Sequence, residues 1–372
     1  MIGLKAQHLS CVNAIARASN SKTTGCFVGS TTFEMFPPTG PQALLNRNID
    51  IDANSAASAL LVFQAILPFL LFAADQESTP ISLSIKGGTN VSFSLSYEYL
   101  DQVLLPTLED LGIAKIERTL ERRGWSHGSA QVGRIRLKIT PIPFASQIRS
   151  NDWLVQSGKE TITKIDVSII VPLELMSYLK DAISSVLSAE FPGVNYDFPV
   201  QENSGHRTRI YTFFVAHTTT GHRYSRDWLY DRKIVLPYPE LSKQIASKVI
   251  RELLTEIERG MAVDEYLEDQ LVIFQALAGG VTCVGGEESL YREVCRETGK
   301  KESSFRPIPK KKLESPFGSG SLHSTTARWV VSQFLPQVEW YGDGRICKGA
   351  GWHVGPLEQN TETQEGLQEL HI

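Results

Sequence analysis

Apolar residues recur three or four residues apart in several stretches of the chain, which is the spacing of one helix face. This pattern predicts helices over 55–74, 97–111, 173–188, 239–259, 264–277 and 325–335. The first helix contains the most hydrophobic run, ALLVFQAILPFLLFAA at 59–74. That run is short for a membrane span and contains Gln64 and Pro68, so it predicts a buried core helix.

Shorter runs rich in branched and aromatic residues predict strands between the helices. These runs cover 81–85, 133–139, 165–171 and 210–216. Strands interleaved with helices along the whole chain favour an α+β fold of packed layers over a helical bundle or a β-sandwich.

Two pairs of predicted helices resemble each other. LVFQAIL at 61–67 is similar to LVIFQAL at 271–277. YLDQVLLPTLEDLG at 99–112 and ARWVVSQFLP at 327–336 share an apolar stripe that ends near a Leu-Pro pair. Repeated supersecondary units would explain both pairs, although apolar helices also resemble one another by chance.

The overall composition is ordinary for a globular protein, with 372 residues, 42% hydrophobic and 21% charged. A formal net charge of −4 gives no overall nucleic-acid signature, so any polyanion site must be a local patch. Five scattered cysteines without a CxxC pair indicate neither a disulfide framework nor a zinc site, and they favour a reducing compartment. Residues 1–30 contain no apolar segment typical of a secretory signal.

The segment 285–320 differs in character, because it is polar and contains the cluster Lys310, Lys311 and Lys312. One interpretation is an exposed, partly disordered loop. The other is a mobile basic arm that helps to hold a polyanion next to His323. The end of the chain, 356–372, is predicted to be a flexible polar tail.

His323 occupies an unusual position in the stretch GSGSLHSTTARWVVSQFLP at 318–336. The stretch predicts a helix that starts near the hydroxyl residues 324–326, which suit capping, and ends near Pro336. His323 then lies just before the helix start, where free N–H groups and a partial positive charge favour a bound phosphate. Arg328, in the first turn, is expected to contact the same anion.

Four motifs follow one another along the chain: GLKAQHLSCVNAIARA at 3–18, KGGTNVSFSLSYEYLDQVLLPTLEDLG at 86–112, VDEYLEDQLVIFQALAGG at 263–280 and SLHSTTARWVVSQFLP at 321–336. Each motif is weak alone. Together, in this order, they resemble the RNA 3'-terminal phosphate cyclase family over most of the chain.

This resemblance implies a large domain of repeated βαβαββ units with a smaller α/β domain inserted. Residues 1–162 would hold an incomplete first repeat and the second repeat, and 163–256 would form the inserted domain. Residues 257–355 would form the third repeat, with the polar loop at 285–320.

Enzymes of this family use ATP to convert an RNA 3'-phosphate into a 2',3'-cyclic phosphate. The resemblance therefore implies RNA 3'-phosphate ends as the partner, and ATP with Mg²⁺ or another divalent ion as cofactors. By resemblance, His323 attacks the α-phosphate of ATP to give a histidine–AMP, and the AMP then passes to the RNA 3'-phosphate, where the 2'-hydroxyl displaces it. An imidazole suits this role, because an ordinary imidazole has a pKa of about 6.5 and is largely neutral at pH 7.

The other motifs imply further site residues. Gln64, Asp269 and Gln270 match positions that bind the nucleotide, and Gln7 and His8 match a Gln-His-Leu motif assigned here to RNA or phosphate contact. Each residue also has a purely structural interpretation. The glutamines would satisfy backbone groups, the aspartate would be an exposed helix-face carboxylate, and the histidine a half-buried surface imidazole.

The chain also departs from the family pattern. The family normally opens with a Gly-rich segment of the type GEGGGQ…LR, whose place lies upstream of Met1. A Gly-Ser-Ala-Gly-Ser stretch is replaced by NSAAS at 54–58, so side chains hinder close backbone approach to a ligand. We therefore expect binding of RNA ends with weak adenylylation. The sequence identifies no metal ligands.

Three other functions stay open at this point. A non-catalytic, cyclase-like ribosome-biogenesis factor would have the same fold but would generally lack the nucleophile that His323 supplies. A pseudoenzyme that binds only RNA or protein is favoured by the departure at the N-terminus. An enolpyruvyl transferase shares the broad fold superfamily, but the chain lacks its Arg/Lys-rich phosphate-binding pattern. A nuclear location is expected by analogy, and the Lys310 cluster is compatible with it.

Overall fold

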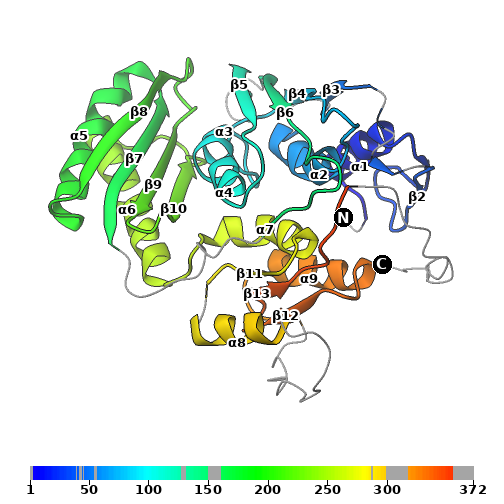
Figure 1. Cartoon of the computed structure of the whole chain (residues 1–372). Coiled ribbons are helices and arrows are strands. Elements are labelled where there is room, and N and C mark those ends of the chain that lie inside the picture. The colour runs from blue at the N-terminus through cyan, green and yellow to red at the C-terminus, as the bar shows by residue number, and fades with distance from the viewer. Residues whose placement is uncertain are drawn as a thin grey trace.

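The structure is a computed structural model of the 372-residue chain, shown in Figure 1. It describes residues 3–38, 40–41, 44, 46–53, 57–126, 131–149, 161–285, 288–298 and 317–354. Within these residues, helices pack against four separate sheets. This arrangement confirms the predicted α+β class.

The first complete unit has the element order β-α-β-α-β-β. Its elements are β3 Asn48–Asp52, α2 Ala59–Leu71, β4 Ile81–Gly87, α3 Tyr97–Tyr99, a π-helical turn Leu100–Leu104, α4 Leu105–Asp110, β5 Glu117–Arg122 and β6 Gly133–Ile139. The strand order is β3-β4-β6-β5, in which only β3 and β4 are parallel. α3, the π turn and α4 follow one another without a break and together confirm the helix predicted over 97–111.

The most hydrophobic run of the chain forms α2, the central helix of the largest core. Ser58 caps its start by accepting hydrogen bonds from the N–H groups of Leu60 at 3.1 Å and Leu61 at 3.2 Å. Eight side chains of α2 are buried in the core cluster that also contains the inward residues of β4 and β6. The predicted core helix is confirmed. Among the described residues we find no helix with the length and hydrophobicity that crossing a membrane requires.

A second unit, coloured green in Figure 1, forms a block to one side of the rest. Its elements are β7 Ile162–Val171, α5 Leu173–Glu190, β8 Asn195–Asn203, β9 Tyr211–Thr218, β10 Arg223–Leu229 and α6 Tyr238–Glu258. The strand order is β10-β9-β7-β8, with β7 and β8 parallel. α5 and α6 cover one face of this sheet and enclose a core of their own, with residues from 165 to 253. The boundaries predicted for an inserted domain, 163–256, stay a prediction.

The C-terminal unit repeats the connectivity of the first from α2 onward, with the additional helix α8 after its first strand. Its elements are α7 Glu265–Leu277, β11 Val281–Cys283, α8 Glu288–Thr298, α9 Leu322–Phe334, β12 Glu339–Tyr341 and β13 Ile346–Lys348. Its strands pair in the order β11-β13-β12, as β4, β6 and β5 do in the order β4-β6-β5. The two similar sequence pairs fall on corresponding helices, α2 with α7 and α3–α4 with α9. This correspondence supports the predicted duplication.

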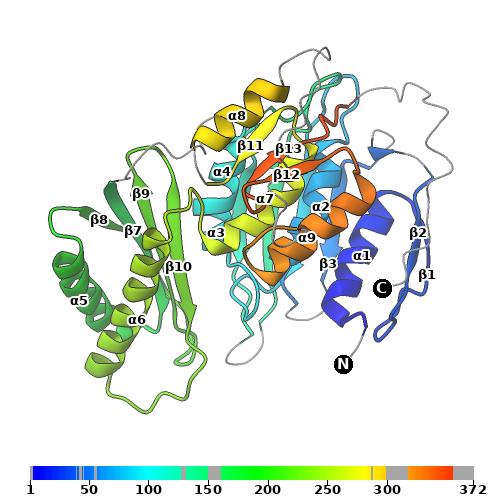
Figure 2. The same ribbon diagram turned by 90° about the horizontal axis from the view of Figure 1, so that it is seen from below.

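The N-terminal part of the described chain contributes α1 Ala6–Ala18 and the antiparallel strands β1 Lys22–Thr24 and β2 Glu34–Phe36. α1 packs along α2, where Ser10 Oγ donates to the Ala53 carbonyl at 3.1 Å. Figure 2 shows α1 and α2 running side by side.

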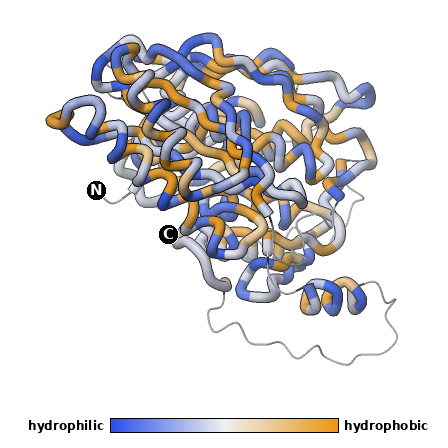
Figure 3. Tube along the Cα trace, turned by 90° about the vertical axis from the view of Figure 1, so that its left-hand side faces the viewer, coloured by the Kyte–Doolittle hydropathy of each residue, from blue (hydrophilic) through white to orange (hydrophobic). Residues whose placement is uncertain are grey.

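The segment predicted as a polar loop, 285–320, contains a helix. α8 has polar and apolar residues on different sides, as Figure 3 shows, and it buries Tyr291 and Val294 against β11. The loop prediction is therefore wrong for residues 288–298. The Lys310 cluster and the predicted tail at 356–372 lie outside the described residues.

Candidate active site

His323 lies at the second position of α9, inside the first turn of the helix. Ser321 caps this helix by accepting a hydrogen bond from the Ser324 N–H at 3.0 Å. The helix therefore begins at Leu322, three residues before the predicted start, and the imidazole lies on the helix and not in front of it. The first turn leaves N–H groups without helical partners, so the positive end of the helix is next to the imidazole.

The imidazole of His323 is 85% exposed and faces one carboxylate. Its Nδ1 lies 3.4 Å from Oδ2 of Asp269, which is in the first half of α7. Burial raises the pKa of Asp269 above the usual range of an aspartate, while a hydrogen bond from Gln270 and the proximity of His323 oppose this shift. The Gln270 Nε2 donates to Asp269 Oδ1 at 2.6 Å. The two oxygens of this carboxylate thus have different partners.

A cavity of about 340 Å³ lies beside this pair, between α2, the π turn, α7 and α9. Gln64, Asp269 and Gln270 form its polar lining. Ala327 and Val330 of α9, one and two turns after the histidine, are part of its apolar lining. The cavity volume is at the small end of the range of about 300–1,000 Å³ that is typical of small-molecule sites. The structure therefore brings four of the predicted site residues to one place.

Gln64 is the unsatisfied polar group of this cavity. Its Nε2 is buried and has no hydrogen-bond partner among the described residues. Pro68 lacks the N–H that would bond to the Gln64 carbonyl within α2, so the backbone at this position also loses a helical partner. Buried polar groups in proteins are normally paired, so an orphaned amide at a cavity wall fits a site that binds a polar ligand.

Arg328 does not face the cavity, which contradicts its predicted contact with an anion. Its side chain is 1% exposed, and its Nη2 donates to Oε1 of Glu268 at 2.7 Å. Its Nη1 donates to the carbonyls of Phe317 at 3.1 Å and Ser319 at 2.7 Å. The guanidinium is already neutralised and enclosed, so a phosphate cannot reach it.

Comparison with known proteins identifies the family of the chain. The family model described as RNA 3'-terminal phosphate cyclase matches residues 2–338. The chain belongs to the RNA 3'-terminal phosphate cyclase family. Curated relatives named RNA 3'-terminal phosphate cyclase include one from Methanosarcina barkeri, 26% identical over 90% of this chain and 82% of the relative. Others are from Methanothermobacter thermautotrophicus (29%, covering 74% and 75%) and Drosophila melanogaster (25%, covering 75% and 73%).

The remaining residues predicted for this cyclase-family chain lie elsewhere. Gln7 and His8 are on α1 and are not part of the cavity wall. His8 is exposed, and its Nδ1 accepts from the N–H of Lys5 at 3.4 Å. Their assignment to RNA contact stays a prediction.

No metal-binding cluster accompanies the cyclase motifs in the part of the chain that the structure describes. A search of those residues finds no group of three or more His, Cys, Asp or Glu side chains that could hold an ion.

Glu268, the buried partner of Arg328, and Ser321, the cap of the histidine helix, were not predicted from the sequence. A signal for Glu268 exists in the helical period of α7. It lies on the same face as Leu271, Val272 and Gln275, which are all buried. A carboxylate on a buried face requires a cationic partner, and Arg328 is that partner.

Proposed function

We propose that this protein is an ATP-dependent RNA 3'-terminal phosphate cyclase that works through a histidine–AMP intermediate on His323. The observation that carries the proposal is the approach of His323 Nδ1 to Asp269 Oδ2, 3.4 Å, at the edge of the cavity that Gln64 and Gln270 line. Membership of the family supports the substrate class, an RNA 3'-phosphate end.

The first step is attack on the α-phosphate of ATP. A proton on Nδ1 donates to the carboxylate of Asp269, which fixes the tautomer and leaves the lone pair of His323 Nε2 free. A bond forms between Nε2 and the α-phosphorus, and the bond from that phosphorus to the bridging oxygen breaks, which releases pyrophosphate. The carboxylate also stabilises the positive charge that develops on the ring.

The nucleotide is bound by residues already described. The apolar walls from α2, α7 and α9 suit a nucleobase or sugar face, and the Gln64 and Gln270 amides can donate to its oxygens or ring nitrogens. The free N–H groups at the start of α9 suit the α-phosphate. A divalent ion would neutralise the remaining phosphate charge, and Mg²⁺ in such sites is held largely by the phosphates themselves with one or two carboxylates.

The later steps transfer AMP and close the ring. An oxygen of the RNA 3'-phosphate attacks the phosphorus of the histidine–AMP, and the bond to Nε2 breaks. The neighbouring 2'-hydroxyl then attacks the activated 3'-phosphate, loses its proton, and displaces AMP. Labelling of His323 is expected to be weak, because Asn54 and Ala57 stand where the family motif has glycines. A nuclear location stays part of the proposal.

The test uses the full chain with ATP labelled at the α-phosphate, a divalent ion, and an RNA oligonucleotide that ends in a 3'-phosphate. We expect acid-labile label on the protein and a 2',3'-cyclic end on the RNA. The matched control is His353→Ala, because the His353 side chain is also exposed and does not line the cavity. If His323→Ala and His353→Ala are labelled equally, the proposed intermediate is wrong. If RNA is bound but never cyclised, a non-catalytic RNA-binding role replaces the enzyme.

A further inference from the structure

The geometry points to a positioning role for one buried ion pair: Glu268 and Arg328 hold His323 at its working distance from Asp269. This inference rests on the proposed function, because it assigns the pair to the same nucleophile. It replaces the anion-binding role that the sequence predicted for Arg328.

The pair lies directly behind both partners of the site. Glu268 is the residue before Asp269 on α7, and Arg328 follows His323 by five residues on α9. Their side chains are almost wholly buried, and the distance between Arg328 Nη2 and Glu268 Oε1 is 2.7 Å. One contact therefore ties the helix that carries the carboxylate to the helix that carries the nucleophile.

Arg328 also fixes the loop that leads into the histidine. Its Nη1 binds the carbonyls of Phe317 and Ser319, so the chain is held at two points before the cap residue Ser321. The position of Ser321 determines where α9 begins, and the start of α9 determines the direction of the His323 side chain.

Glycines allow this loop to approach the pair closely. A Cβ on Gly320 would lie 2.6 Å from Oε1 of Glu268, and Gly320 has a φ of +110° that other residues rarely adopt. On the other side, a Cβ on Gly344 would lie 2.6 Å from Nη1 of Arg328. The guanidinium and the carboxylate are thus enclosed by backbone, and neither has room to turn toward a ligand.

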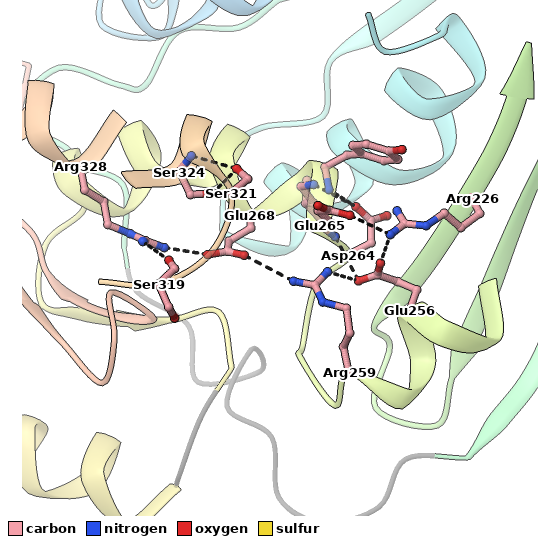
Figure 4. A network of polar contacts seen from close by, with 12 residues as sticks. Arg226, Glu256, Arg259, Asp264, Glu265, Glu268, Ser319, Ser321, Ser324 and Arg328 are labelled. Carbon is pink, nitrogen blue, oxygen red and sulfur yellow. Dashed lines mark hydrogen bonds and ion pairs between the residues drawn. The ribbon is translucent and has the colours of Figure 1, made fainter. Parts of the chain in front are cut away.

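The pair is the end of a longer network, shown in Figure 4. Glu268 lies between Arg328 and Arg259, whose Nη2 is 3.8 Å from the second carboxylate oxygen. Arg259 binds Glu256 at the end of α6, and Glu256 binds Arg226 on β10. The network therefore connects the second unit to the helix that carries His323. The weaker contact at 3.8 Å implies a smaller contribution from Arg259 than from Arg328.

The test compares Arg328→Lys and Glu268→Gln with the matched control Arg118→Lys in the full chain. Arg118 is a suitable control because its guanidinium also binds carboxylates, Asp101 and Glu109, and two backbone carbonyls, but at a place away from the cavity. A lysine cannot reproduce a guanidinium that binds several groups at once, so Arg328→Lys releases the loop without removing the charge.

Two measurements distinguish positioning from simple stability. Without ATP, we expect amide hydrogen exchange in 317–324 to be about tenfold faster in both site variants and unchanged in the control. With ATP, the maximal rate of adenylylation should fall by about tenfold to a hundredfold in the site variants, while the ATP concentration at half-maximal rate stays nearly constant. Arg259→Ala should show the same changes at a smaller size.

Equal exchange and equal rates in the site variants and the control would overturn the inference. So would loss of folding in both site variants, judged by circular dichroism, because the pair would then be a requirement of the core. If the wild-type protein takes no label, the proposed function fails, but the exchange measurement still decides whether the pair fixes the loop.

Discussion

The first unit and the C-terminal unit share the order of a helix, a strand, a second helix and two strands, but they use corresponding positions differently. α3, which follows β4, begins at the cap Ser96, and α9, which follows β11 and α8, begins at the cap Ser321. Each serine accepts a hydrogen bond from the N–H three residues later. The second helical residue is Glu98 in one unit and His323 in the other. Glu98 is 2% exposed and forms an ion pair with Arg123, whereas the imidazole is open to solvent.

The glutamines of the two similar helices, α2 and α7, also differ in whether their side-chain amides have hydrogen-bond partners. Gln275 of α7 is buried, and its Nε2 donates to Thr282 Oγ1 at 3.2 Å. Gln64 of α2 borders the cavity, and its Nε2 has no partner among the described residues. One scaffold thus satisfies a polar group in its core and leaves the equivalent group without a partner among the described residues at the cavity wall. The backbone arrangement is similar in both units. The units therefore differ in which of their polar side chains have partners within the protein.

Exchanging the second helical residue in each unit should have the largest effects. His323→Gln should reduce adenylylation by at least about a thousandfold and leave the free energy of unfolding nearly unchanged, because the side chain is exposed. Glu98→Gln should lower the free energy of unfolding by about 3 kcal/mol, because it weakens the buried contact with Arg123. Labelling assays measure adenylylation, and urea denaturation measures the free energy of unfolding. If both variants lost labelling and stability to a similar degree, the contrast between an exposed functional residue and a buried structural one would be wrong.

Asp269→Asn should slow adenylylation by about a hundredfold, because the amide cannot stabilise the charge that develops on the imidazole. The matched variant is Asp101→Asn, which changes a carboxylate of the π turn between α3 and α4 that binds Arg118. We expect Asp101→Asn to be labelled at the wild-type rate. A single-turnover labelling assay compares them, and an equal loss in both would count against a specific role for Asp269.

The two glutamines should separate ligand binding from stability. Gln64→Leu should weaken AMP binding about tenfold, which corresponds to one hydrogen bond, and should not lower stability, because it removes an unpaired buried amide. Gln275→Leu should lower the free energy of unfolding by about 1 kcal/mol and leave AMP binding intact. Titration calorimetry with AMP and urea denaturation give the two quantities. If only the Gln275→Leu variant bound AMP more weakly, Gln275 and not Gln64 would be the glutamine that contacts the ligand.

The second unit contains a half-buried carboxylate, Asp227, which belongs to neither of the two compared units. Burial raises the pKa of Asp227 from 3.8 to about 6, although a hydrogen bond from Tyr211 and the charge of Arg226 oppose this shift. A raised pKa means that the folded state binds the proton more tightly, so this group stabilises the fold below about pH 4 and loses that contribution as the pH rises toward 6.

Asp227→Asn should therefore gain stability relative to the wild type between pH 4 and 7, by an amount on the order of 2 kcal/mol. Urea denaturation at several pH values measures the difference, and labelling of His323 at pH 7 serves as the control that should not change. A difference that is constant with pH would show that Asp227 has an ordinary pKa.

The helices of the core were predictable, whereas the start of α9 was not. The apolar period of 59–74 and 264–277 is strong, and both segments fold as helices within a few residues of the predicted bounds. Around the start of α9, four hydroxyl residues from 321 to 326 can each cap a helix. Ser321 is the one that does so, and Arg328 donates to the carbonyl of Ser319 just before it, a contact between residues that no local pattern relates.

The residues that gather around the cavity include four that the resemblance had singled out, but the direction of the side chains was not predictable. The apolar stripe predicted for α9 includes Val330, which lines the cavity, and Phe334, which is 66% exposed. A stripe that faces a ligand cavity has the same period as one that faces a core. Arg328 was predicted to contact an anion because of its place near the start of the helix. The sequence does not tell which side of the first turns is enclosed.

The most direct test of the account is to map the AMP. The full chain is incubated with ATP and a divalent ion, digested under conditions that preserve phosphoramidates, and sequenced by tandem mass spectrometry. The account predicts AMP on Nε2 of His323, in the peptide that contains Ser321 and Ser324. AMP on a lysine, or none on a protein shown to bind ATP, would contradict it.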